Sequence, residues 1–155
     1  AEERGFVFKL MMHCRREKGG LTAYVEPTLL GGHLPEANLP IRSSIATLYG
    51  KYVGRLSFFG AGAGTLPTGM NMMQDAMDVY MGVGAVQNYA ANAALDNTLA
   101  VHPYYIRTAA RLPNVREQGA GWVLTEPMPV KAMHGLAKEL AQKGEAVFFA
   151  GLVED

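Results

Sequence analysis

The residues of this chain that are best arranged for chemistry are the glycines of one short loop, Gly60-Ala61-Gly62-Ala63-Gly64. The loop follows the apolar run Leu56-Ser57-Phe58-Phe59 and leads through Thr65-Leu66-Pro67-Thr68 into a methionine-rich segment. Glycine has no Cβ, so the backbone can approach a ligand closely, and the N–H groups at the start of a helix attract negative charge. The order strand, glycine loop, helix therefore predicts a place where a phosphate or a carboxylate could bind.

Two interpretations of Gly60, Gly62 and Gly64 stay open on spacing alone. The spacing is G-x-G-x-G and not the G-x-G-x-x-G of a Rossmann dinucleotide site, and no later strand supplies the acidic residue that would bind a ribose hydroxyl. The same glycines would equally serve a tight turn that packs closely against a neighbouring element.

Other ionisable residues give no second candidate site. His13 and Cys14 are neighbours on an expected strand, so their side chains point to opposite faces. His33 lies in an expected loop with no cysteine, histidine or carboxylate cluster at metal-ligand spacing. Asp75 and Asp78 match a solvated stripe near the start of a helix. We therefore expect no catalytic residue and no metal ligand in this chain.

The elements that must position the glycine loop begin with two hairpins. Residues 6–14 and 21–26 predict one antiparallel pair, which Pro27 is expected to end because proline lacks the N–H that a central ladder needs. Residues 40–47 and 48–59 predict a second pair. We expect these four strands to form one sheet.

A long helix is expected after the loop, from Thr68 to beyond Tyr89. The hydroxyl of Thr68 is a suitable N-cap, and Pro67 restricts the entry of the chain. Polar residues fall on one narrow side at helical period, while methionine, alanine and valine populate the rest. This pattern predicts a helix that is buried on more than one side.

A second unit is expected after His102-Pro103, which breaks the preceding helix. The pattern predicts a strand over 104–111, a polar loop over 112–121 and a short strand over 122–124. An amphipathic helix over 129–143 and an apolar strand over 146–153 complete it. The expected division is thus 1–101 and 102–155.

Composition narrows the classes of partner. Fourteen basic and fourteen acidic residues cancel among 155, so no basic surface favours nucleic acid or an anionic membrane. Cys14 is the single cysteine and no apolar run is long enough to span a bilayer. No secretion signal is recognisable, and we expect a cytoplasmic protein.

Three segments in order resemble homoserine dehydrogenase. They are Gly5-Phe6-Val7-Phe8-Lys9-Leu10, then Tyr24-Val25-Glu26-Pro27-Thr28-Leu29, and the run from Val53 to Thr68, which reads VGRLSFFGAGAGTLPT. The family has a V-x-P-T-L strand and a V-G-E-x-x-F-Y-G-x-G-A-G-x-x-P-T segment at these places. This chain departs from the pattern at Arg55, where the family usually has an acidic residue, and at the methionines before Asp75.

The resemblance implies a C-terminal part of an enzyme that interconverts L-homoserine and L-aspartate 4-semialdehyde with NAD or NADP, in threonine and methionine synthesis. In the family, a Rossmann domain and the catalytic lysine lie upstream of the matched region. The chain alone is therefore expected to be inactive and to bind no cofactor, whereas Gly60, Gly62 and Gly64 would help to close the cofactor site of the complete enzyme.

The fold that these observations predict is α+β. A mixed or antiparallel sheet would pack on a long helix, and a small ACT-like β/α unit would follow, because Pro-Tyr-Tyr-Ile-Arg at 103–107 resembles the start of that regulatory module. Its unpaired strands would need a partner, so we expect a homodimer or a larger assembly. The alternative function is a non-catalytic regulatory or assembly module with an ACT-like effector response.

Overall fold

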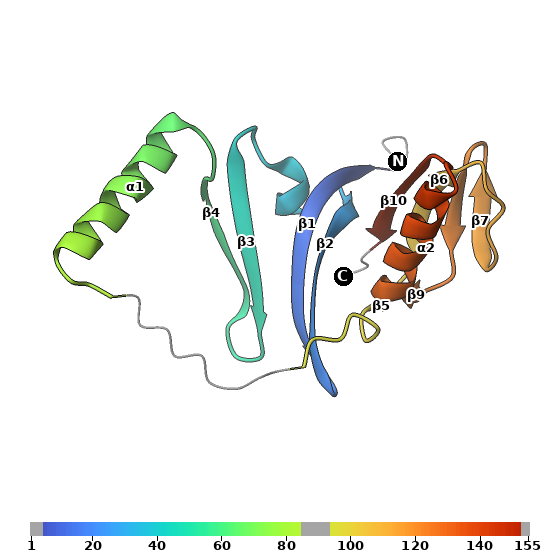
Figure 1. Cartoon of the computed structure of the whole chain (residues 1–155), viewed down its shortest axis with the longest axis horizontal. Helices are drawn as coiled ribbons and strands as arrows, with labels where there is room; N and C mark the ends of the chain where they lie inside the picture. Colours follow the sequence, from blue (N-terminus) through green and yellow to red (C-terminus); the bar gives the residue numbers. More distant parts are fainter. Residues whose placement is uncertain (1–4, 85–93, 153–155) are drawn as a thin grey trace. The chain divides into compact units, whose positions relative to one another are not determined.

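A computed structural model describes residues 5–84 and 94–152 of the chain. The chain divides into two compact units, one formed by Ala1–Ala37 with Asn92–Asp155 and the other by Asn38–Ala91. The larger unit thus joins segments from both halves of the sequence, and strands on either side of residue 101 share one sheet (Figure 1). The expected domains, 1–101 and 102–155, stay a prediction.

The larger unit is built on a six-stranded sheet with the order β1-β2-β10-β6-β8-β7. Strand β10 runs parallel to β2, and every other neighbouring pair is antiparallel. The strands are β1 (Phe6–Glu17), β2 (Gly20–Gly31), β6 (Tyr104–Thr108), β7 (Val115–Gly119), β8 (Trp122–Thr125) and β10 (Val147–Leu152). This mixed sheet, with the helices, confirms the α+β class.

Helix α2 (Val130–Gln142) packs against β10 and against the short strand β9 (Met128–Pro129), which pairs with β5 (Val101–His102). Its apolar side supplies Met133, which is fully buried against Tyr104 and Ile106 of β6. The helix ends in a Schellman motif, because Gly144 has a φ of +77° and the N–H of Glu145 reaches back to the carbonyl of Leu140. The expected helix over 129–143 and strand over 146–153 are confirmed within two residues.

The first hairpin is confirmed, but its return strand does not end at Pro27. Strand β2 continues to Gly31, and Pro27 pairs with Leu10 of β1. On its other side, β2 pairs with β10 only at Thr28 and Leu29. The missing N–H of Pro27 therefore interrupts no pair with β10, so the strand can run through it.

Another difference lies between Leu112 and Gly121, where a polar loop was expected. Strand β7 occupies Val115–Gly119 and pairs with β8 through a tight turn at Gly121, whose φ is +74°. Alternating partly buried and exposed side chains along β7 are the signature of an edge strand with one covered face. The charged residues of this segment obscured that alternation.

The smaller unit contains the second expected hairpin, β3 (Ser43–Gly50) and β4 (Gly54–Ala61), and helix α1 (Thr65–Tyr80). A short 3₁₀ turn over Pro35–Asn38 precedes them. The hairpin forms its own two-stranded sheet, so the expectation of a single four-stranded sheet was wrong. The hydrophobic pattern of a hairpin predicts how its own two strands pair. Whether two hairpins join into one sheet depends on long-range packing, which the pattern does not encode.

Helix α1 differs from its expectation at both ends. It begins at Thr65 with Gly64 as N-cap, three residues before Thr68. Pro67 falls in the first turn, where its missing N–H breaks no helical hydrogen bond. The helix ends at Tyr80 because Gly82, with a φ of +69°, forms a Schellman cap in which the N–H of Val83 reaches Asp78. Tyr89 lies outside the described residues.

The sequence predicts that this helix is buried on more than one side, but α1 is not buried in the structure of this chain. None of the described residues of α1 is buried, and its methionines are largely exposed. Separately, no helix within 5–84 or 94–152 is both long and apolar enough to cross a bilayer.

Replacement of Met133 by alanine should lower the free energy of unfolding by about 2–5 kcal/mol, because it leaves a cavity between α2 and β6. Chemical denaturation followed by circular dichroism measures the change. Met12 of β1, in the same unit, is 78% exposed, and Met12→Ala is the matched control, with an expected change within roughly 1 kcal/mol. Equal losses in the two variants would contradict the assignment of Met133 to the core.

Candidate functional site

The glycine segment leads from β4 into α1, but the loop is shorter than the sequence predicted. Gly60 and Ala61 belong to β4, where Gly60 pairs with Ser44, and the loop proper begins at Gly62. Its middle is fixed from within, because the N–H groups of Gly62 and Ala63 both donate to the carbonyl oxygen of Arg42, at 3.1 and 3.3 Å. Arg42 itself has a φ of +69° just before β3. These two amides are thus occupied, and the loop is no open cradle of amides for a phosphate.

The three glycines are required for three different reasons. A Cβ on Gly62 would collide with the side chain of Ser44 on β3. Gly64 has a φ of +125°, a conformation that side-chain-bearing residues rarely adopt. A Cβ on Gly60, in contrast, would meet no atom within 4 Å. Packing and backbone conformation explain Gly62 and Gly64, whereas Gly60 leaves open space beside the backbone.

The start of α1 is the part of this loop that suits an anionic group. Gly64 has no side chain to cap the helix, and the side chain of Thr68 makes no cap because it lies inside the first turn. The N–H groups of the first turn carry the positive end of the helix dipole. The segment thus offers a helix start without a side-chain cap and, on the preceding strand, open space at Gly60.

The other residues weighed in the sequence form no second site in the described part of the chain. Cys14 is an exposed free thiol. Asp78 accepts a hydrogen bond from the Gln74 amide at 2.7 Å along α1. His33 lies in the loop after β2. In the described part of the chain, no three histidine, cysteine or carboxylate side chains are placed to hold a metal ion.

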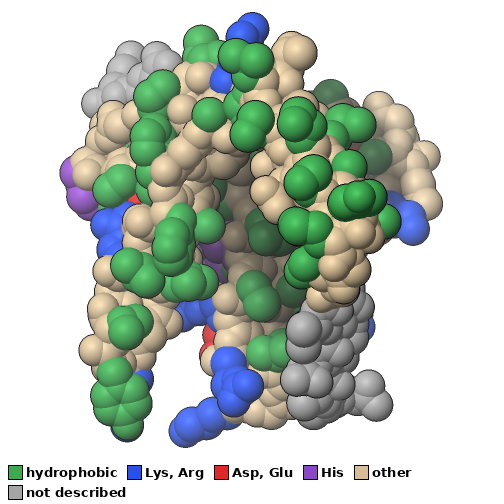
Figure 2. Space-filling model, turned by 90° about the vertical axis from the view of Figure 1, so that its left-hand side faces the viewer, with side chains coloured by type: hydrophobic (Ala, Val, Ile, Leu, Met, Phe, Trp, Pro, Cys, Tyr) green, Lys and Arg blue, Asp and Glu red, His purple; other side chains and the backbone are tan. Residues whose placement is uncertain are grey.

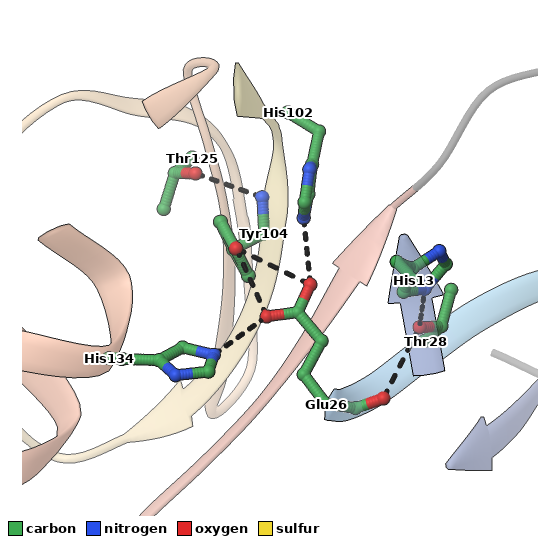
Figure 3. A network of polar contacts seen from close by, with 7 residues as sticks. All are labelled: His13, Glu26, Thr28, His102, Tyr104, Thr125 and His134. Atoms are coloured by element: carbon green, nitrogen blue, oxygen red, sulfur yellow. Dashed lines mark hydrogen bonds and ion pairs between the residues drawn. The ribbon is translucent and has the colours of Figure 1, made fainter. Parts of the chain in front are cut away.

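A buried polar cluster in the larger unit has no counterpart in the sequence-based expectations (Figure 3). Its centre is Glu26 of β2, whose side chain is fully buried. One carboxylate oxygen accepts from Nε2 of His102 at 2.9 Å, and the other accepts from Nε2 of His134 at 2.9 Å. The hydroxyl of Tyr104 lies 3.2 and 3.4 Å from the two oxygens. We call these four residues the Glu26 cluster.

Strand β10 passes close to the Glu26 cluster and leaves room for its side chains. A Cβ on Gly151 of β10 would lie 2.5 Å from the nearer oxygen of Glu26 and 2.6 Å from Nε2 of His102. Only glycine therefore lets β10 pass this close. Tyr104 is fixed on its other side, since its N–H donates to the hydroxyl of Thr125 at 3.0 Å.

A third histidine, His13 of β1, extends the polar region. Nε2 of His13 is hydrogen-bonded to the hydroxyl of Thr28 at 3.0 Å, and that hydroxyl lies 3.3 Å from the carbonyl oxygen of Glu26. The ring of His13 also stacks on Tyr24 at 5.0 Å between centroids. Imidazole and phenol rings thus line the inner face of the sheet next to the carboxylate.

The carboxylate of Glu26 is the charged centre of the cluster. Burial raises the pKa of Glu26, but the hydrogen bonds from His102, His134 and Tyr104 outweigh burial, and the pKa lies below its usual value. Burial first, and then the neighbouring Glu26, raise the pKa of Tyr104 and take that of Tyr24 to about 12. Burial lowers the pKa of His13. Glu26 is thus an anion that three donors satisfy at neutral pH.

A faint signal of the cluster was present in the sequence. Thr22, Tyr24, Glu26 and Thr28 alternate along β2, and all four are buried, so the inner face of the strand is polar. The expectation that the strand ends before Pro27 placed Glu26 at a strand terminus instead of inside a sheet. Its partners come from positions 102, 104 and 134, and no local pattern connects them.

A cavity of about 300 Å³ lies over the outer side of the cluster. Helix α2 contributes Val130, Lys131 and His134 to its wall, and the segment before β5 contributes Leu95, Asp96 and Asn97. Asn97 is fixed by a pair of 2.9 Å hydrogen bonds with the backbone of Ala23. The side chain of His134 is 38% exposed, whereas that of His102 is 10% exposed.

Glu26→Gln should lower the free energy of unfolding at pH 7 by about 2–4 kcal/mol, because an amide cannot accept from both histidines. The folded pKa of Glu26 lies below its ordinary 4.5, so its contribution is present above that pH and is lost as the pH falls through the folded pKa. Unfolding measured from pH 7 to 3 should show the two proteins converging in acid. A difference that stays constant with pH would contradict an ionised Glu26.

Comparisons with known proteins agree on one family. A family model described as homoserine dehydrogenase matches residues 1–77. The homoserine dehydrogenase of Bacillus subtilis is 32% identical over 75 residues, which are 48% of this chain and 17% of that protein. The enzyme of Neisseria gonorrhoeae is 28% identical over 146 residues, which are 86% of this chain and 34% of that protein.

Solved structures show the same fold. A homoserine dehydrogenase from Thiobacillus denitrificans aligns with a TM-score of 0.68 at 22% identity, over 99% of this chain and 44% of that one. The enzyme from S. aureus, solved at pH 6.5, aligns with a TM-score of 0.57 at 18% identity over 99% of this chain and 43% of that one. Residues 1–77 of this chain belong to the homoserine dehydrogenase family, and the chain spans less than half the length of the relatives that it matches.

Proposed function

We propose that this chain is part of an enzyme that interconverts L-homoserine and L-aspartate 4-semialdehyde with NAD or NADP. The observation that carries the proposal is the family match over residues 1–77, which contains the whole glycine loop. In this proposal the Rossmann domain and the catalytic lysine belong to the complete enzyme outside these 155 residues. The chain alone then has no turnover and serves threonine and methionine synthesis only as part of the whole.

The glycine loop is where this chain would meet the cofactor. The nicotinamide supplies hydride transfer when it is bound. The residues that would hold the cofactor are Gly60, Gly62 and Gly64, with Gly60 offering space beside its backbone and Gly64 opening a helix that has no side-chain cap. The helix start would favour a negatively charged group of the cofactor or the substrate.

Residues 102–155 would act as an ACT-like unit of the same enzyme. A reducing cytoplasm would keep Cys14 as the free thiol that the structure contains.

We also propose that the chain assembles as a homodimer or a larger oligomer. Every residue of β4 is exposed, including Phe58 and Phe59, and no described residue of α1 is buried. Figure 2, which faces the side on which α1 is drawn in Figure 1, shows many hydrophobic side chains at the surface. Exposed apolar surface on this scale favours association. This observation also supports the second candidate function, a non-catalytic assembly or regulatory module.

Activity of the complete protein tests the first proposal. The full-length enzyme should oxidise L-homoserine with NAD or NADP, and Gly60→Ala should raise the Kd of the cofactor about tenfold or more at unchanged stability. Gly62→Ala tests the structural role of the segment separately, because its Cβ would strike Ser44 and should lower stability by about 1–3 kcal/mol. A complete protein without turnover would favour the assembly module, and unchanged cofactor binding in Gly60→Ala would remove Gly60 from the site.

Assembly can be measured on the 155-residue chain by sedimentation at micromolar concentration. The mass should be at least twice the 16.7 kDa of one chain. Phe59→Ser on β4 should weaken association, whereas Ile41→Ser, at a 94% exposed loop position, serves as the control and should not. A wild-type chain that sediments as a monomer would contradict the proposal.

A further inference from the structure

One carbonyl oxygen holds the loop that follows β4. The N–H groups of Gly62 and Ala63 both donate to the carbonyl of Arg42, at 3.1 and 3.3 Å. A peptide oxygen has two lone pairs, so this single group can satisfy both donors. The two donors immediately precede Gly64, the N-cap of α1. A shift of the Arg42 carbonyl would therefore shift the entry of the chain into the helix.

Arg42 presents this carbonyl from an unusual backbone conformation. Its φ is +69°, and in the described part of the chain Asn114 is the only other residue besides glycine with a positive φ. The N–H of Ser43 donates to the carbonyl of Pro40 at 3.1 Å, so Arg42 is the third residue of a four-residue turn. A positive φ at this position is the mark of a type II turn, in which glycine or asparagine is usual. An arginine in this conformation is strained.

Strand β3 holds the segment on the other side of the turn. Ser44 pairs with Gly60 across the hairpin, and its side chain lies where a Cβ of Gly62 would stand. Figure 1 shows the start of β3 and the end of β4 at the same end of the hairpin, next to the entry into α1. Strand pairing thus fixes the segment up to Ala61, and the Arg42 carbonyl then holds the two residues that follow.

We propose that Arg42 is a positioning residue for the cofactor site and acts through its backbone carbonyl. The inference rests on the proposed function, in which Gly60 and Gly64 meet the cofactor. The turn directs the carbonyl at Gly62 and Ala63, and these two residues carry the chain from β4 to the N-cap of α1. The guanidinium has no part in this role. Glycine can therefore replace Arg42, whereas a residue that avoids a positive φ cannot.

Substitutions that differ in their tolerance of a positive φ test the proposal. Glycine adopts this conformation freely, whereas valine, which is branched at Cβ, avoids it. In the complete protein, Arg42→Val should raise the Kd of the cofactor about tenfold or more. Arg42→Gly should keep that Kd within about twofold of the wild-type value.

Amide hydrogen exchange of the 155-residue chain gives a readout that needs no cofactor. In the unaltered chain, the N–H groups of Gly62 and Ala63 should exchange about tenfold or more below their intrinsic rates, because both are hydrogen-bonded. Arg42→Val should abolish this protection, and Arg42→Gly should keep it. The measurement on the unaltered chain remains valid if Arg42→Val fails to fold.

Asn114 provides the matched control for backbone strain alone. Its φ is +57° and its carbonyl accepts from the N–H of Glu126 at 2.9 Å, but it belongs to the larger unit. Asn114→Val should lower the Tm by about 2–6 °C, as Arg42→Val does. It should leave the cofactor Kd and the protection of Gly62 and Ala63 unchanged.

The possible failures can be told apart. Unprotected amides at Gly62 and Ala63 in the unaltered chain, or unchanged protection in Arg42→Val, would overturn the positioning role whether or not a cofactor binds. A Kd that rises as much in Arg42→Gly, or in Asn114→Val, would also overturn it, because the effect would then come from the side chain or from general strain. A wild-type complete protein that binds no cofactor would instead overturn the proposed function, and with it the site that Arg42 positions.

Discussion

The larger unit depends on one buried carboxylate. Glu26 accepts hydrogen bonds from His102, Tyr104 and His134, which come from β5, β6 and α2. Apolar contacts between α2 and β6 are non-directional, whereas these hydrogen bonds define one arrangement of the strands and the helix. A charge buried in this way is tolerable only if all its donors are present. The sheet is therefore specified by a polar centre as well as by its apolar layer.

The glycine loop of the smaller unit is held by close packing and by backbone conformation instead of by a buried charge. Ser44 and the carbonyl of Arg42 fix its middle, and the positive φ of Gly64 directs the chain into α1. Among these three glycines, Gly60 alone has neither a packing nor a conformational reason in the structure. The cofactor proposal requires glycine at this position, whereas a purely structural role does not.

The sequence correctly predicted the strands and the helix whose residue pattern lies within the element itself. The apolar run from Phe6, the amphipathic segment from Val130 and the apolar run from Val147 each carry a signal within the element itself. Predictions failed where the outcome depends on distant residues. Whether Pro27 ends β2 is decided by where β10 pairs, and the role of Glu26 is decided by partners at 102, 104 and 134. The glycine segment lies between a strand and a helix as predicted, with Gly60 and Ala61 in β4, but spacing could not separate packing at Gly62 from backbone conformation at Gly64.

The charge of Glu26 is the property on which the account of the larger unit depends. It is tested most directly by a nuclear magnetic resonance titration of the side-chain carboxyl carbon of Glu26 in the 155-residue chain. The hydrogen bonds of the cluster predict an apparent pKa below the ordinary value of 4.5, with the carboxylate ionised throughout the neutral range. An apparent pKa above 4.5 would show that burial outweighs the three donors, and would contradict an anionic centre for this fold.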